Sequence, residues 1–94
     1  MPSQWGPHVP LYSLVVEHQG KPFSTQLIAA SAHEAVAAFF VHPVAASVTP
    51  VLNATDIIYV TPMEGLVNMW AACAGREGRY VSITCTRTVT RQGT

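Results

Sequence analysis

Residues 11–40, LYSLVVEHQGKPFSTQLIAASAHEAVAAFF, decide the fold expected for this chain. The first part, Leu11–His18, alternates apolar and polar residues as a half-buried strand does. A second alternating stretch, Phe23–Ala29, follows after a four-residue turn in which Gly20 supplies the positive-φ option. One face of the first strand would be formed by three of its residues, Tyr12, Leu14 and Val16. These two strands are predicted to form a hairpin.

A helix is predicted directly after the hairpin. Ser31-Ala32-His33-Glu34 has the spacing of a capping box, in which the serine hydroxyl accepts from the backbone amide three residues on. The helix should run to about His42, with Val36, Phe39 and Phe40 as its apolar stripe. Pro43 would end it, because a residue before proline avoids the α region.

The second half of the chain contains a similar signature. A short strand is expected over Ile57–Val60, and Thr61-Pro62-Met63-Glu64 then repeats the capping pattern. This predicts a second helix to about Ala74, ending at Gly75, and a last strand over Arg79–Arg91. The prediction is therefore one α+β domain over residues 11–94. It would hold a small antiparallel sheet, two capped helices and the order β-β-α-β-α-β, after an extended arm at residues 1–10.

Charge is scarce along the chain. Of 94 residues 49% are hydrophobic and only 11% charged, with zero net charge, where about 25% charged is usual. This composition excludes a strongly basic nucleic-acid tail and an acidic disordered tail. It also leaves few ionic groups to cover the surface. We therefore expect a homodimer, intertwined or tightly packed, in which two copies shelter apolar surface.

The sequence predicts neither catalysis nor a cofactor. None of the four histidines is spaced with a carboxylate or cysteine as metal ligands are, and no nucleophile or phosphate-loop motif occurs. The two cysteines, Cys73 and Cys85, are expected to be buried free thiols. Neither a signal peptide nor an apolar run of membrane-spanning length is recognised, so a cytoplasmic location without membrane contact is expected.

Two groups of residues could contact DNA. Residues 76–94 carry four arginines and one glutamate, so a basic strand end rich in hydroxyls could contact phosphate; those arginines are Arg76, Arg79, Arg87 and Arg91. On the second strand Ser24 and Gln26 share a face after Lys21, and glutamine can pair with adenine. The alternatives are an edge strand guarded by arginines and an ordinary solvated strand face.

Strand Phe23–Ala29 followed by the Ser31-capped helix resembles the opening of ribbon-helix-helix repressors of the Arc and MetJ type, over about twenty residues. The resemblance implies that one strand from each of two subunits forms a ribbon in the DNA major groove. Ser24 and Gln26 would then read bases, and the helix N-terminus would hold a phosphate. In that family the second helix follows at once, whereas here a loop and the strand Ile57–Val60 intervene.

Two main functions follow. The first is a small non-enzymatic, homodimeric DNA-binding or regulatory protein. The alternative is a protein-interaction or assembly module without nucleic acid, in which an open strand edge adds a strand to a partner. Arginines of the two subunits that lie on one face of the dimer would favour DNA, and scattered arginines would favour the interaction module. A third interpretation, a small-molecule pocket lined by Trp70, Cys73 and Tyr80, competes with a simple core role for those residues.

Overall fold

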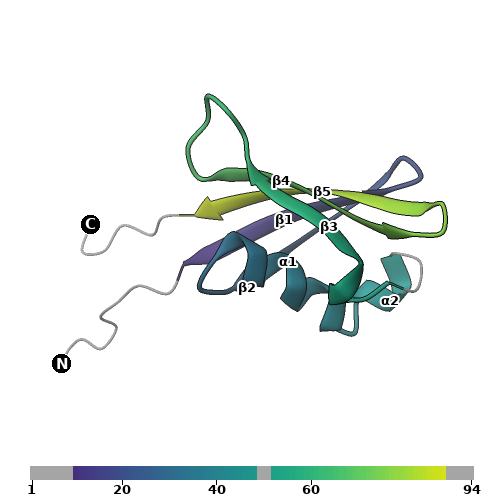
Figure 1. The fold of residues 1–94 in the computed structure, drawn as a ribbon. Helices are drawn as coiled ribbons and strands as arrows, with labels where there is room; N and C mark the ends of the chain where they lie inside the picture. Colours follow the sequence, from purple (N-terminus) through teal and green to yellow (C-terminus); the bar gives the residue numbers. More distant parts are fainter. Residues whose placement is uncertain (1–9, 49–51, 89–94) are drawn as a thin grey trace.

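The computed structural model describes residues 10–48 and 52–88 (Figure 1). The predicted N-terminal arm, apart from Pro10, and Arg91 lie outside the described residues. The described chain folds around one antiparallel sheet in the order β2-β1-β5-β4-β3. Its five strands are β1 (Leu11–His18), β2 (Lys21–Ile28), β3 (Ile57–Pro62), β4 (Met69–Arg76) and β5 (Arg79–Thr88).

The first helix and the hairpin before it are confirmed. β1 and β2 pair over their whole length, from Leu11 opposite Ile28 to His18 opposite Lys21. Helix α1 spans Ala32–Val41, and its N-cap Ser31 accepts a hydrogen bond from the Glu34 amide at 3.1 Å. The chain then forms the short helix α2 (Ala45–Val48) and the 3-10 turn η2 (Ala54–Asp56) before β3 begins.

The predicted second helix over residues 61–74 is wrong, and so is the order β-β-α-β-α-β. The strands and α1 follow one another as β-β-α-β-β-β, because β3 and β4 form a hairpin here. Two residues inside the expected helix, Gly65 at φ 85° and Asn68 at φ 61°, have left-handed backbone that a right-handed helix excludes. The Met63 amide donates to the Met69 carbonyl at 3.0 Å, which is hairpin pairing and not a helical cap.

The composition of strand β4 explains why a helix was predicted here from helical propensity. Alanine is the best helix former, yet the alanine-rich β4 pairs with β3 on one side and β5 on the other. Both edges of its backbone are thereby satisfied. Read with a period of two, Trp70, Ala72 and Ala74 fall on one face, and both alanines are buried. Pairing with two neighbours and burial of one face outweigh the helical preference of the alanines.

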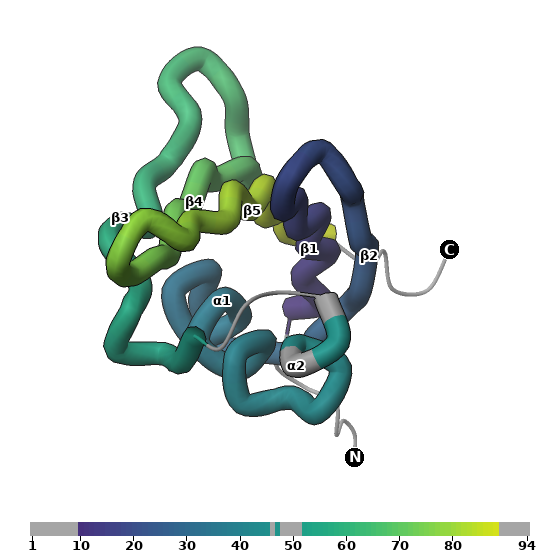
Figure 2. The backbone as a smooth tube through the Cα atoms, turned by 90° about the vertical axis from the view of Figure 1, so that its right-hand side faces the viewer, coloured from purple at the N-terminus to yellow at the C-terminus, as the bar shows by residue number. Residues whose placement is uncertain are grey.

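The hydrophobic core lies between α1 and one face of the sheet. Phe39 and Val36 of α1 are fully buried with Leu14, Val16 and Val81 of the sheet. Trp70 packs at the edge of this core, with its ring centroid 5.8 Å from that of Tyr12. Figures 1 and 2 show α1 and α2 on the same side of the sheet, while the β3–β4 hairpin tip rises on the other side. No described helix covers that second face, which we call the open face.

Candidate functional site

The predicted site residues are divided between the two faces of the sheet. Ser24 and Gln26 alternate with the core-facing residues of β2 and therefore project from the open face. The described arginines follow the opposite alternation. Arg79 and Arg87 are in step with the buried Val81 on β5, and Arg76 pairs with Arg79. The structure thus separates the predicted base-reading residues from the predicted phosphate contacts.

The arginines are also spread along the sheet. Arg79 begins β5 and Arg87 lies near its end, about 27 Å away at 3.4 Å per residue. Lys21 begins β2, next to the turn after His18. The His18 Nδ1 atom lies 3.4 Å from the Tyr80 carbonyl oxygen, which brings this turn close to the start of β5. Lys21 and Arg79 are therefore at one end of the sheet and Arg87 at the other.

The turns at the first of these ends enclose a shallow polar depression. Its volume is about 430 Å³, and it is lined by His18, Gln19, Gly78, Arg79 and Tyr80. One arginine and one histidine give it little positive charge, and Glu17 and Glu77 lie next to it in sequence. It is a weak candidate for phosphate.

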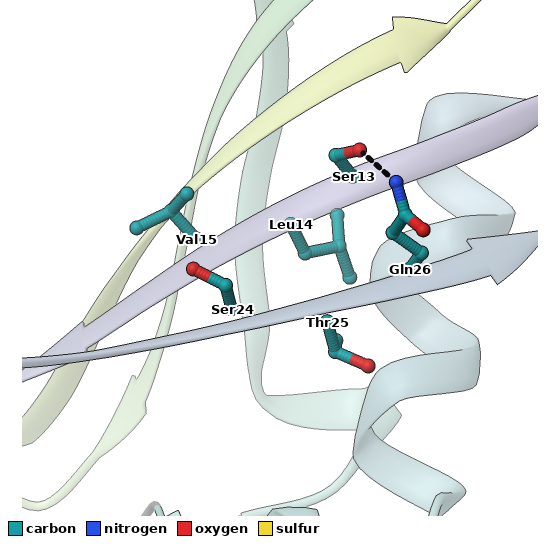
Figure 3. A pocket seen from close by; sticks show the side chains of 6 residues that line it. All are labelled: Ser13, Leu14, Val15, Ser24, Thr25 and Gln26. Carbon is teal, nitrogen blue, oxygen red and sulfur yellow. Dashed lines mark hydrogen bonds between the residues drawn. The ribbon is translucent and has the colours of Figure 1, made fainter.

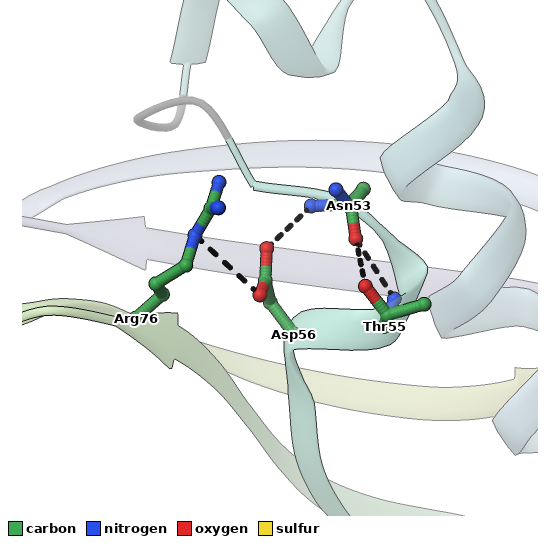
Figure 4. Close-up of polar contacts among 4 residues, drawn as sticks. All are labelled: Asn53, Thr55, Asp56 and Arg76. Atoms are coloured by element: carbon green, nitrogen blue, oxygen red, sulfur yellow. Dashed lines mark hydrogen bonds and ion pairs between the residues drawn. The ribbon is translucent and has the colours of Figure 1, made fainter.

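Arg76 is engaged within the fold (Figure 4). Its Nε atom lies 3.6 Å from Asp56 Oδ1. The other carboxylate oxygen of Asp56 accepts from the Asn53 amide at 3.0 Å, and the Asn53 side chain in turn caps η2 by accepting from the Thr55 amide. Arg76 therefore anchors η2 to the end of β4.

Figure 3 shows the open face over β1 and β2. Ser13, Val15, Ser24 and Gln26 project to one side, and Leu14 and Thr25 project to the other. A depression of about 410 Å³ lies among these six residues. The Gln26 side-chain amide donates to Ser13 Oγ at 3.1 Å, so the exposed Gln26 side chain leans toward the neighbouring strand β1.

The outer edge of β2 is the most distinctive feature of this region. The Ala29 amide donates to the Pro10 carbonyl at 3.3 Å. Because hydrogen-bonded and non-bonded pairs alternate in an antiparallel ladder, the odd-numbered residues of β2 direct their N–H and C=O groups toward β1. The even-numbered residues direct theirs outward. The outward set is Pro22, Ser24, Gln26 and Ile28.

The pairing of the other strands gives the same alternation independently. The Arg87 amide donates to the Asn68 carbonyl at 2.8 Å, so the odd-numbered residues of β5 face β4. Its even-numbered residues then bond β1 through Ser13 and Val15, which leaves Tyr12, Leu14 and Val16 to bond β2. Two independent backbone hydrogen bonds, one at each side of β1, therefore show that the amides of Ser24, Gln26 and Ile28 point outward.

No described residue hydrogen-bonds to the outward amides of Ser24, Gln26 or Ile28, and all three residues are exposed. Ile28 is 68% exposed, which is high for a large apolar residue. Pro22 occupies an outward position, where its missing N–H removes no ladder bond. A proline at this place in the sequence is a signal for an edge strand, whereas the prediction assigned Pro22 to the turn before the strand.

No cluster of metal-ligating side chains is found in the described part of the chain, and the more buried of its two thiols, Cys85, is not activated. No three potential ligands among histidine, cysteine, aspartate and glutamate come together there. Cys73 and Cys85 are free thiols. Burial raises the pKa of the Cys85 thiol to about 11, so it stays protonated and unreactive. Cys73 is only half-buried and faces the other side of the sheet, contrary to the prediction that both are buried.

Not one of the described helices is long and apolar enough to cross a bilayer. Comparison of the chain with protein-family models found no match, and comparisons with curated proteins and with solved structures found none either. The candidate site is therefore defined by geometry alone, as the outer edge of β2 together with the open face next to it.

Proposed function

We propose that this chain is a protein-association module that binds an extended strand of a partner along the outer edge of β2. The observation that carries the proposal is the row of outward amides at Ser24, Gln26 and Ile28, to which no described residue bonds. An unpaired row of this kind is a template for another strand, whose main-chain hydrogen bonds supply affinity.

The surroundings of this edge suit a protein partner. In β2 the only charged residue is Lys21, at its first position. On the neighbouring open face, β1 and β2 carry hydroxyl, amide and aliphatic side chains, with Val15 42% exposed, and a single charged residue, Glu17, opposite Pro22. Little charge has to be desolvated when another strand packs here, which favours protein over nucleic acid.

DNA binding stays a prediction that the geometry supports less well. The three described arginines lie at two ends of the sheet, on the side opposite Ser24 and Gln26, and one of them, Arg76, is paired with Asp56. Association with DNA through phosphate contacts would weaken steeply with salt. Strand addition through backbone hydrogen bonds would change little over the same range. Titrations at low and moderate salt therefore separate the two functions.

The proposal is tested with two variants at one position. Gln26→Pro removes the outward N–H, while Gln26→Ala removes the side chain and keeps that N–H. Peptides selected from a displayed library for binding to the chain are titrated against both variants. We expect any partner strand, whether a peptide or another copy of the chain, to bind the alanine variant and not the proline variant. Association that is indifferent to Gln26→Pro would contradict the proposal.

A further inference from the structure

We propose that the strand taken up by β2 is β2 of a second copy of this chain, paired antiparallel about Thr25, so that two sheets become one. This inference rests on the proposed function and names the partner. It follows from three observations: the direction of the backbone groups, the order of side chains along β2, and the position of its charge.

The backbone groups of β2 are complementary to themselves. With Thr25 opposite Thr25 of the second copy, Ser24 lies opposite Gln26 and Pro22 opposite Ile28. In this register the Ser24 and Gln26 amides donate to the carbonyls of the facing Gln26 and Ser24, and the Ile28 amide donates to the Pro22 carbonyl. All three outward donors of each copy are satisfied. The missing N–H of Pro22 leaves only the Ile28 carbonyl without a partner.

Shifting the register weakens this match. If the centre of pairing moves by one residue, to Ser24 or to Gln26, the outward groups of the two copies still face one another. A terminal residue of the outward set then lies beyond the end of the partner strand and has no residue of that strand opposite it. Centring on Thr25 is the arrangement that keeps the whole outward set in register.

The side chains of β2 are arranged symmetrically about the same residue. On the side facing the helices, Phe23 would lie opposite Leu27, and both are partly buried side chains that pack against the core. On the open face, Ser24 would meet Gln26. Ile28, which is 68% exposed, would contact Pro22 at each end of the paired strands. Cross-strand pairs of this kind are the unit that stabilises a sheet.

The charge on β2 does not oppose pairing. Lys21 is its one charged residue, and in this register it faces Ala29 of the second copy. The two lysines would be about 27 Å apart at 3.4 Å per residue, which is beyond the Debye length of about 8 Å at physiological ionic strength. Two copies can therefore pair without bringing like charges together.

The opposite edge of the sheet is blocked against such pairing. β3 is interrupted by a bulge between Ile57 and Tyr59 and ends in Pro62. The Met63–Met69 bond fixes the alternation of this strand, so that within the regular ladder Val60 and Pro62 point outward and only Val60 has an N–H. Bulges and prolines are devices that prevent edge-to-edge association. On β2 the proline stands at the second residue, and the remaining strand is regular.

The first test is the mass of the chain in solution. Light scattering after size exclusion, over a concentration series from micromolar to millimolar, is expected to approach twice the 10.1 kDa chain mass. Gln26→Ala should still dimerise, and Gln26→Pro should remain monomeric. Circular dichroism checks that Gln26→Pro keeps its sheet, as expected since Pro22 already occupies an equivalent outward position.

The second test determines the register in which the two β2 strands pair. In a Cys73→Ser background, Thr25→Cys places a cysteine opposite itself in a non-hydrogen-bonded pair, where the Cα atoms are about 4.5 Å apart. That distance allows a disulfide. Ser24→Cys is the control, because its own copies would be two residues out of register. We expect oxidation to cross-link Thr25→Cys and not Ser24→Cys.

Three outcomes would overturn the inference. They are a wild-type chain that stays monomeric throughout the series, a dimer that survives Gln26→Pro, and cross-linking through Ser24→Cys but not Thr25→Cys. A monomer that still binds selected peptides in a manner lost in Gln26→Pro overturns only the second copy as partner and leaves the proposed function standing. A monomer that binds no peptide overturns both.

Discussion

The two edge strands of the sheet, β2 and β3, differ in how well they are protected against pairing with another strand. β3 is shortened, bulged and ended by Pro62, and it offers little backbone for another strand to bind. β2 is regular over eight residues and directs the amides of Ser24, Gln26 and Ile28 outward. One molecule thus contains a protected edge and an unprotected one. The contrast indicates that protection is available to this fold and is absent from β2.

The largest effect is expected from weakening helix α1, which supports both edge strands. Helix α1 packs against β2 and β3, and its Phe39 is fully buried. We expect Phe39→Ala to cost about 3–5 kcal/mol of unfolding free energy, because it leaves a cavity beneath the sheet. Urea denaturation measures the loss. Val41→Ala on the same helix is the control, since Val41 is 74% exposed and should cost almost nothing. An equal effect of the two substitutions would place the core elsewhere.

A smaller loss of stability is expected to distinguish the inner edge of β2, which bonds β1, from its outer edge. Thr25 directs its N–H toward β1 and Gln26 directs its N–H outward. Thr25→Pro should cost on the order of 2–3 kcal/mol, because it breaks a ladder bond and leaves the Leu14 carbonyl without a donor. Gln26→Pro should cost less than about 1 kcal/mol in the monomer, where it breaks no ladder bond. Thermal melts of both variants at low concentration compare them. Equal destabilisation would mean that the alternation along β2 is misassigned.

The smallest effect concerns the β3 side. Arg76 and Asp56 hold η2 beside β4, just before β3 begins, and the Arg76 side chain is 46% exposed. Arg76→Ala should therefore cost less than about 1 kcal/mol and leave association through β2 unchanged. Arg87→Ala, at the far end of β5, is the matched control for loss of a positive charge. A change in dimer mass with Arg76→Ala would show that the two edges are coupled.

The region around β2 was also the part of the fold that could be predicted from sequence. The alternation of residues 11–29 and the Ser31 cap are local signals, and the structure confirms the hairpin and α1. Residues 61–74 misled the prediction because Thr61-Pro62-Met63-Glu64 and the following alanines carry helical signals. Their strand structure depends on pairing with β3 and β5, which local sequence does not encode.

The candidate site was predicted only in part. Ser24 and Gln26 were selected as polar residues on one face of a strand, and they do lie on the open face and the outer edge. Their grouping with the arginines could not be judged without the strand order and register, which place β5 beyond β1 and turn its Arg79 and Arg87 to the other face. The outward amides are backbone groups. They become visible only once the register is known, although Pro22 marked the strand as an edge.

Amide hydrogen exchange at β2 is the sharpest test of whether this strand pairs with a second copy of the chain. Exchange rates are measured by NMR for the Ser24, Gln26 and Ile28 amides at low and high protein concentration, with the outward Val60 amide of β3 as internal reference. We predict that the three β2 amides exchange quickly in dilute solution and become protected as concentration rises, while Val60 does not change. If the β2 amides exchange as freely as Val60 at every concentration, β2 does not pair with a second copy of the chain.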